Sequence, residues 1–383
     1  MKKLILLIYV YLSLFFFVKA KVIVNKNIGK ITRVKLKKKM IIKGTGKGYY
    51  LKLPVSIKVD DKGNIYILDG DSGGWRFYEI LKFNNIGKFE RRIVSRGQGP
   101  GEAFDIGGYF ISNNKIYIYD YSMKKMIVKD LYGNIMREFR IRISDLNLQK
   151  RISISFISVY KKKFYFSLVT TDFATKKTSI INEDNFYCIY SGSSWKIGRT
   201  NFPTLIYFIR GSNGVPGIIP IGSIKKSVYK SKYLFINNTA KYLIKLYDIE
   251  KDRVILSFKR EYRRIKNMVY NEKEEGGVKI AGIWYYKPHQ KYYDDIQKLL
   301  IRSNKLWVLT STTDRKRGVL TDVFNDKGLF INKFYLELKN KTDYSKINDI
   351  PMVISGNYLY TIERDKNDEP VIIKYEIPEK ENL

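Results

Sequence analysis

The residue types best suited to chemistry lie in a glycine-rich segment, Arg-Gly-Gln-Gly-Pro-Gly-Glu, at residues 96–102. Glycines let consecutive backbone N–H groups point at one anion, so this segment could form a phosphate cradle. No Gly-Lys-Ser/Thr follows it, and no helix pattern opens after it. The alternative is structural, with the glycines letting the chain cross between strands while Glu102 accepts hydrogen bonds from backbone donors. Arg96, Gln98 and Glu102 are the candidate ligand-binding residues of this segment.

A second polar segment, Asp-Gly-Asp-Ser-Gly-Gly at residues 69–74, resembles the start of a calcium loop. The further oxygen donors and the closing Glu of such a loop are absent at the required spacing, which favours a turn between strands. No catalytic residue is identified. The identity of any metal is left open, and calcium is the one cofactor considered, because carboxylate and amide oxygens from distant segments could converge on it.

His289 is the only histidine, which excludes any multi-histidine metal site. A Ser-His-Asp set could use only this residue, and the chain has no Gly-x-Ser-x-Gly elbow. His289 is either a loop residue on the surface or a ligand contact. Nearby, Trp284 and Tyr285 with Lys287 and Lys291 could form an aromatic, cationic rim suited to glycans. Alternatively, these aromatic side chains cover the hydrophobic flank of a sheet.

Strands must position all of these residues, because one strand pattern returns six times along the chain. Asn-Ile-Tyr-Ile-Leu-Asp at residues 64–69 is echoed by Lys-Ile-Tyr-Ile-Tyr-Asp at residues 115–120. Weaker copies begin at residues 163, 232, 305 and 357. A unit that repeats every 40–50 residues or so is typical of propellers and solenoids. Four strands with intervening turns fit between residues 55 and 94, which is the content of one propeller blade.

The sequence therefore predicts an all-β, six-bladed β-propeller. The sixth blade offers only three clear strands, at residues 351–354, 358–362 and 371–377. An unassigned alternating segment at residues 31–36 could supply the fourth, so we expect this N-terminal strand to close the ring. Closure protects sheet edges that would otherwise be exposed. Two non-repeating insertions, near residues 195–222 and 261–293, either form the binding face or cap the ring.

The first twenty residues have the layout of a secretory signal peptide. A short basic start precedes an apolar run over residues 4–18, and Val18 and Ala20 suit a cleavage site. An uncleaved anchor is the alternative. We expect residues 1–20 to be a signal peptide and residues 21–383 to form one propeller domain, secreted or periplasmic, with no later transmembrane segment. The single cysteine, Cys188, excludes an internal disulfide bond and lies in an apolar strand pattern.

The formal net charge of +34 would attract polyanions of any kind. The basic residues are spread through almost every segment, which indicates a general compositional bias rather than one patch. Attachment to an anionic surface remains open. A nucleic-acid partner is disfavoured because a secreted protein seldom meets nucleic acid.

The segment at residues 96–104 resembles the Gly-x-Gly-Pro-Gly-Glu-Phe connector of secreted six-bladed β-propeller proteins related to NHL repeats. Here Ala-Phe replaces the single Phe of that pattern. The Asp-x-x-Gly-Asn-Ile-Tyr hairpin at residues 60–66 also fits NHL-type blades. The resemblance covers roughly residues 30–378 and implies the propeller fold, whereas fold alone does not fix activity.

Two functions remain from the sequence. The first is a secreted binding scaffold for a protein, peptide or glycan on the propeller face, with Arg96, Gln98, Glu102, Trp284, Tyr285 and His289 as contacts. The second is a metal-dependent hydrolase or lyase with carboxylates in the central channel. The second requires at least three inward-facing carboxylate or amide oxygens at the ring axis.

Overall fold

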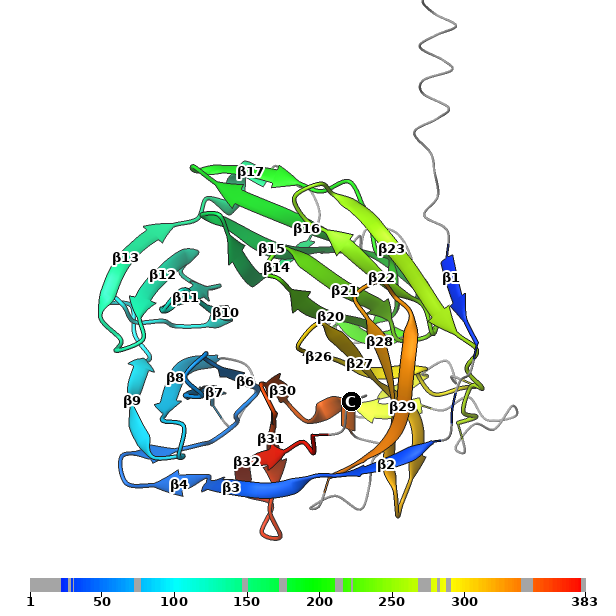
Figure 1. Ribbon diagram of the computed structural model, residues 1–383. Coiled ribbons are helices and arrows are strands. Elements are labelled where there is room, and N and C mark those ends of the chain that lie inside the picture. Colours follow the sequence, from blue (N-terminus) through cyan, green and yellow to red (C-terminus); the bar gives the residue numbers. More distant parts are fainter. Residues whose placement is uncertain are drawn as a thin grey trace, which may run out of the picture.

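The computed structural model describes residues 22–26, 29, 31–71, 77–146, 151–171, 178–210, 216–221, 223–267, 277–280, 283–286, 291–338 and 347–379. Its strands form six main sheets around a central axis, which is the predicted six-bladed β-propeller (Figure 1). Residues 1–20, the predicted signal peptide, lie outside the described residues. Within the described part, no helix has the length and hydropathy needed to cross a lipid bilayer.

The first three blades follow the repeat found in the sequence. Their strands, from the axis outward, are β6 (Ser56–Val59), β7 (Ile65–Gly70), β8 (Phe77–Phe83) and β9 (Phe89–Val94) in blade 1; β10 (Ile106–Ser112), β11 (Lys115–Asp120), β12 (Lys125–Asp130) and β13 (Ile135–Arg140) in blade 2; and β14 (Arg151–Tyr160), β15 (Lys163–Thr171), β16 (Thr178–Ser191) and β17 (Ser194–Ile197) in blade 3. A further hairpin, β18 (Thr204–Arg210) and β19 (Pro216–Ile221), extends the blade 3 sheet from β16. The 3-10 turn η1 (Ile143–Leu146) lies between blades 2 and 3.

Blades 4 to 6 complete the ring. Their strands are β20 (Ile224–Tyr229), β21 (Tyr233–Asn238), β22 (Ile244–Asp248) and β23 (Arg253–Arg260) in blade 4; β26 (Ile296–Arg302), β27 (Lys305–Asp314), β28 (Gly318–Asn325) and β29 (Phe330–Glu337) in blade 5; and β30 (Met352–Ser355), β31 (Tyr358–Arg364) and β32 (Pro370–Glu376) in blade 6. A small hairpin, β24 (Gly277–Ile280) and β25 (Ile283–Tyr286), lies between blades 4 and 5, and η2 (Ile347–Asp349) precedes blade 6.

The hydrophobic core is divided among the blade interfaces. The described residues form six apolar clusters, and each joins two neighbouring blades. One of them joins Ile57 of blade 1 to Tyr360 and Ile372 of blade 6, the last blade. Burial of apolar surface therefore continues across the junction where the chain's two ends meet, which stabilises the closed ring.

The start of the chain lies along the outer edges of three successive blades. Strand β1 (Val22–Asn25) pairs in parallel with β23, and β2 (Thr32–Lys35) pairs in parallel with β29. Strand β3 (Lys37–Lys43) then pairs antiparallel with β32 as the fourth strand of blade 6. Figure 1 shows these blue strands beside the blades built from later residues. We call β1, β2 and β3 together the N-terminal strap.

An N-terminal strand closes the ring as predicted, but the expected segment, residues 31–36, was wrong. That segment is an extra fifth strand of blade 5, and the closing strand is β3. Val34 and Leu36 made residues 31–36 look like a core strand, and both are buried between blades 5 and 6. Strand β3 looked too polar because it carries four lysines. An outermost strand needs few buried side chains, and lysines suit an exposed edge. A short hairpin, β4 (Thr45–Gly46) and β5 (Tyr49–Tyr50), then leads toward blade 1.

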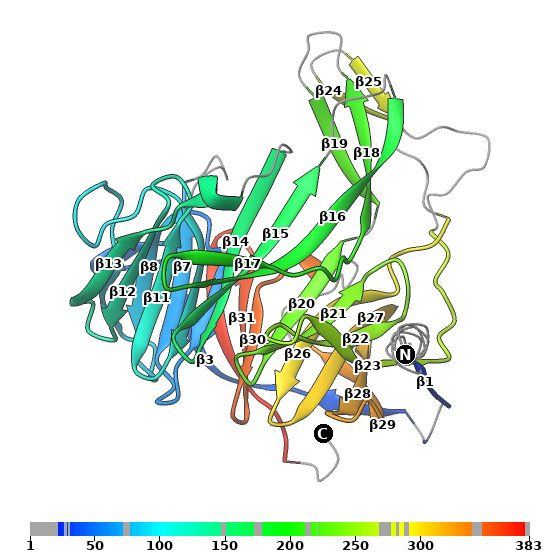
Figure 2. The same cartoon turned by 90° about the horizontal axis from the view of Figure 1, so that it is seen from above.

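The two faces of the ring differ. All six inner strands begin on one face of the ring, which we call the start face. The segments that connect one blade to the next also lie on this face. The opposite face, the turn face, carries the tight turns such as residues 60–64 and 84–88. Figure 2 shows the β18–β19 and β24–β25 hairpins, from the two predicted insertions, rising beyond the ring on the same side. Each lies in a chain segment that leads into an inner strand, so both belong to the start face.

Cys188 lies on β16 in the apolar cluster between blades 2 and 3, and its side chain is fully buried. Burial raises the pKa of the thiol to about 12, so little thiolate exists near neutral pH. At pH 8 we expect native protein to react with a thiol reagent at least about 100-fold more slowly than protein unfolded in guanidinium chloride. A fast native reaction would contradict the buried position.

Candidate ligand-binding site

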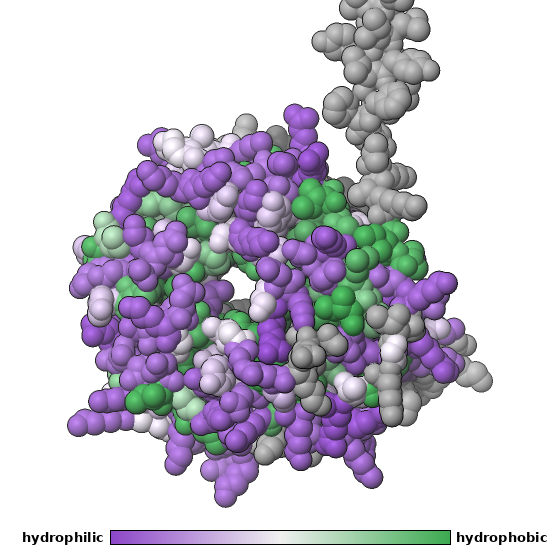
Figure 3. All heavy atoms as spheres, in the orientation of Figure 1, coloured by the Kyte–Doolittle hydropathy of each residue, from purple (hydrophilic) through white to green (hydrophobic). Residues whose placement is uncertain are grey.

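An open channel runs along the axis of the ring (Figure 3). One inner strand from each blade lines it, and most neighbouring inner strands contact one another. Two adjoining cavities of about 550 and 600 Å³ occupy this space. They share Val55, Ser56 and Lys58 from blade 1 with Lys226 and Val228 from blade 4. Volumes of this size suit a small organic ligand.

Two lysines that form no ion pair within the described residues lie on opposite blades of this channel. Lys58 is on β6, and its amine is 5.3 Å from the centre of the Tyr109 ring. Lys226 is on β20 and is exposed to the channel. The strands around the channel partly desolvate each amine and lower its pKa to about 8. Within the described residues, neither amine has a hydrogen-bond or ion-pair partner.

Two more lysines line the second cavity and are better compensated. The Lys298 amine donates a hydrogen bond to the carbonyl of Asn348 at 3.1 Å and another to the carbonyl of Ile350. Burial lowers the pKa of Lys225, while the nearby carboxylates of Asp294 and Asp349 oppose this shift. Lys58 and Lys226 therefore remain the cations available to a ligand.

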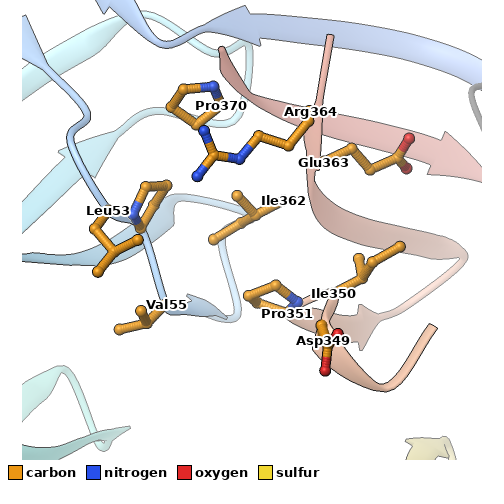
Figure 4. Close-up of a pocket in the computed structure, with 10 residues that line it drawn as sticks. Leu53, Val55, Asp349, Ile350, Pro351, Ile362, Glu363, Arg364 and Pro370 are labelled. Atoms are coloured by element: carbon orange, nitrogen blue, oxygen red, sulfur yellow. The ribbon is translucent and has the colours of Figure 1, made fainter. Parts of the chain in front are cut away.

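An apolar pocket of about 460 Å³ adjoins the channel on the start face, between blades 6 and 1 (Figure 4). Its walls are mostly aliphatic, and three of its ten lining residues are prolines. Val55 lines this pocket and both channel cavities, so the three spaces meet at that side chain. Glu363 points away from the neighbouring Arg364, and its carboxylate accepts hydrogen bonds from Thr361 and Tyr375.

The glycine-rich segment lies between β9 and β10 on the start face. Two carboxylates, one from the segment itself and one from β13, accept hydrogen bonds from its backbone N–H groups. The Glu102 carboxylate accepts a hydrogen bond from the Gly99 N–H at 3.0 Å. Glu138 of β13 accepts another from the Gly101 N–H at 2.7 Å. A Cβ atom at residue 97 would lie 1.8 Å from a Glu102 oxygen, so any other residue there would displace the Glu102 carboxylate. The backbone donors thus serve the connector, as the structural alternative proposed.

The other two candidates in this segment are on the surface. The Arg96 guanidinium lies 5.1 Å from the Tyr78 ring centre and 5.5 Å from that of Phe104. Gln98 is exposed. Both lie on the same face as the channel mouth, but neither lines the cavities described above.

Asp69, the first residue of the calcium-like segment, also forms hydrogen bonds with the backbone of a preceding segment. Its two carboxylate oxygens accept hydrogen bonds from the N–H groups of Lys52 and Leu53 at 2.9 and 2.7 Å. Burial raises the pKa of this carboxyl group. Asp120, at the equivalent place in blade 2, accepts a hydrogen bond from the N–H of Phe104 in the same way. The repeated Asp thus anchors the chain that enters each of these two blades.

The remaining predicted contacts are only partly described. Trp284 and Tyr285 lie on β25 of the hairpin between blades 4 and 5, where the backbone alone is described. His289 lies outside the described residues. The described residues contain no group of three or more His, Cys, Asp or Glu side chains placed to hold a metal. Among the described lining residues of the two channel cavities, Asp105 is the one carboxylate, against four lysines.

Lys58 and Lys226 were not identified from the sequence. The one signal that could have identified them is a lysine within the innermost strand of a blade, because that strand lies nearest the ring axis. Ser-Ile-Lys-Val at residues 56–59 reads as an ordinary alternating strand. Only the closed ring shows that its lysine lies across the axis from the blade 4 lysine.

Comparison with known proteins supports the fold. Residues 44–207 match the DUF5128 family, described as a 6-bladed beta-propeller. A candidate exported protein from Bacteroides fragilis has a similar structure, with a TM-score of 0.50 and 11% identity, covering 94% of this chain and 100% of that protein. A member of the DUF4221 family from Bacteroides vulgatus gives a TM-score of 0.53 and 12% identity, covering 91% and 99%. No curated protein matches the chain.

Proposed function

We propose that this six-bladed β-propeller is an exported binding protein that takes its ligand on the start face, at the mouth of the central channel. One observation carries the proposal: the first channel cavity, the apolar pocket and both non-repeating hairpins lie toward this single face. Loops and insertions on a rigid repeat scaffold are common places for binding residues. Arg96, Gln98, Trp284 and Tyr285 are proposed as outer contacts, because they belong to start-face segments. His289 is proposed with them because it follows Trp284 and Tyr285 closely in the sequence.

Export is proposed on two grounds. The first twenty residues have the layout of a signal peptide. The similar B. fragilis structure is described as a candidate exported protein. No observation favours the hydrolase or lyase alternative, because the described channel presents lysines where that chemistry needs converging carboxylate or amide oxygens.

A matched pair of variants tests the face. Val55→Trp places a large ring where the three cavities meet, and Ile86→Trp places the same ring on an exposed turn of the opposite face. We expect wild type and Ile86→Trp to give the same signals on glycan and peptide arrays, and Val55→Trp to lose them. Circular dichroism and melting temperature establish that both variants fold. Loss of signal in folded Ile86→Trp, with retention in folded Val55→Trp, would overturn the assignment.

A further inference from the structure

We propose that the ligand is a sugar acid, whose carboxylate or sulfate group lies between Lys58 and Lys226 in the channel. This inference rests on the proposed function and names the chemistry of that same site. It begins with the two amines that have no partner on the described chain. Lys226 is exposed to the channel and Lys58 is half-buried, and neither amine forms an ion pair or hydrogen bond within the described residues that would stabilise the fold. A structural interaction therefore does not account for the two lysines.

The rest of the lining has the groups that a sugar ring needs. Serine hydroxyls and aromatic rings line the first cavity alongside the two lysines; these residues are Ser56, Ser153, Ser155, Phe77, Tyr109 and Tyr121. Hydroxyl groups hydrogen-bond to sugar hydroxyls, and aromatic rings pack against the apolar face of a sugar. An inorganic ion would use the cations alone. This combination favours an acidic sugar over a bare anion.

The other charged groups around the two amines leave the site positive. The titratable side chains that line the same cavities are Asp105, Tyr109, Tyr121, Lys225 and Lys298. Asp105 accepts a hydrogen bond from Ser122 at 3.4 Å and lies near Lys124. Burial raises the pKa of Tyr109, so its hydroxyl stays neutral, and it donates to the carbonyl of Tyr66 at 2.9 Å. Asp105 is thus the one carboxylate among the described lining residues, and neither Lys58 nor Lys226 forms an ion pair with it.

The test is calorimetric titration of the full-length mature protein with glucuronate, glucose 6-sulfate, glucose and the dipeptide Asp-Asp at constant ionic strength. We expect the acidic sugars to bind at least about tenfold more tightly than glucose or the dipeptide. Preference between carboxylate and sulfate identifies the anionic group. Lys58→Met and Lys226→Met should each weaken glucuronate binding by about tenfold or more. The control Lys62→Met, an exposed lysine on the turn face, should leave binding within about twofold.

Two further readouts separate a ligand role from a structural one. Both channel variants should keep or raise the melting temperature, because each removes an unpaired charge. Affinity for glucuronate should fall as the pH rises through about 8, where the folded-state amines lose their protons. Equal binding of glucose and glucuronate, tighter binding of the dipeptide, or unfolding of both variants would overturn the sugar-acid assignment. In each of those cases, loss of the array signals in Val55→Trp but not in Ile86→Trp would still support ligand binding on the start face.

Discussion

Replacing Ile42 by aspartate is expected to lower the free energy of unfolding by about 3–5 kcal/mol. Ile42 is the buried residue of β3, the strand that closes blade 6, and only 3% of its side chain is exposed. It packs in the apolar cluster that joins blades 6 and 1. The substitution removes an aliphatic side chain from that cluster and places an unpaired carboxylate there. The edge strand should detach from β32, and the ring should open at its one non-covalent seam.

The neighbouring residue provides the control. Ile41 lies on the same strand, and 50% of its side chain is exposed. Ile41→Asp makes the same chemical change and should cost no more than about 1 kcal/mol, which is the range of strand propensities. Denaturant unfolding measures both variants, and limited proteolysis reports whether the strap has detached. Equal losses in the two variants would show that β3 contributes to stability only through its backbone.

Replacing Asp322 by leucine is expected to cost about 3–5 kcal/mol, because it leaves a buried guanidinium without its counter-charge. Asp322 on β28 is fully buried and accepts a hydrogen bond from Arg260 Nε of β23 at 2.6 Å. The same carboxylate oxygen accepts a hydrogen bond from the Tyr242 hydroxyl. The ion pair thus joins blade 4 to blade 5 inside a group of aromatic rings that includes Tyr262.

A double-mutant cycle measures this coupling. Arg260→Met with Asp322→Leu removes both charges and should recover at least half of the stability lost in Asp322→Leu, because an apolar pair of similar volume can replace a buried ion pair. Urea denaturation of the wild type, the two single variants and the double variant gives the interaction free energy. Additive losses in the double variant would contradict a direct interaction across the blade interface.

Much of the fold could be predicted because a propeller repeats one local pattern. The pattern of Ile65 and Tyr66 before Asp69 marks a strand with a buried, hydrogen-bonded carboxylate at its end, and the same signal recurs at Asp120. The closing strand escaped prediction for a physical reason. An outermost strand pairs mainly through its backbone, so its side chains carry little apolar pattern, and the four lysines of β3 hid the buried Ile42.

Little of the candidate site could be predicted. Glu102 drew attention because it lies in a recognisable motif, and the structure shows its carboxylate holding that motif together. Lys58 and Lys226 are separated by well over a hundred residues, and neither lies in a motif. Their relationship exists only through the sixfold arrangement of the inner strands, which no local spacing encodes. A site at the axis of a ring is formed by residues that are remote from one another in sequence.

The N-terminal strap also imposes an order of events on biosynthesis. Its three strands are among the first parts of the chain to be made, yet their partners β23, β29 and β32 are made progressively later, the last of them near residue 376. Strand β1 must therefore wait unpaired until blade 4 is made, β2 until blade 5 is made, and β3 until blade 6 is made. A polypeptide that ends before β32 lacks the strand with which β3 pairs, so its β3 stays unpaired. In the complete chain all three strands of the strap are paired.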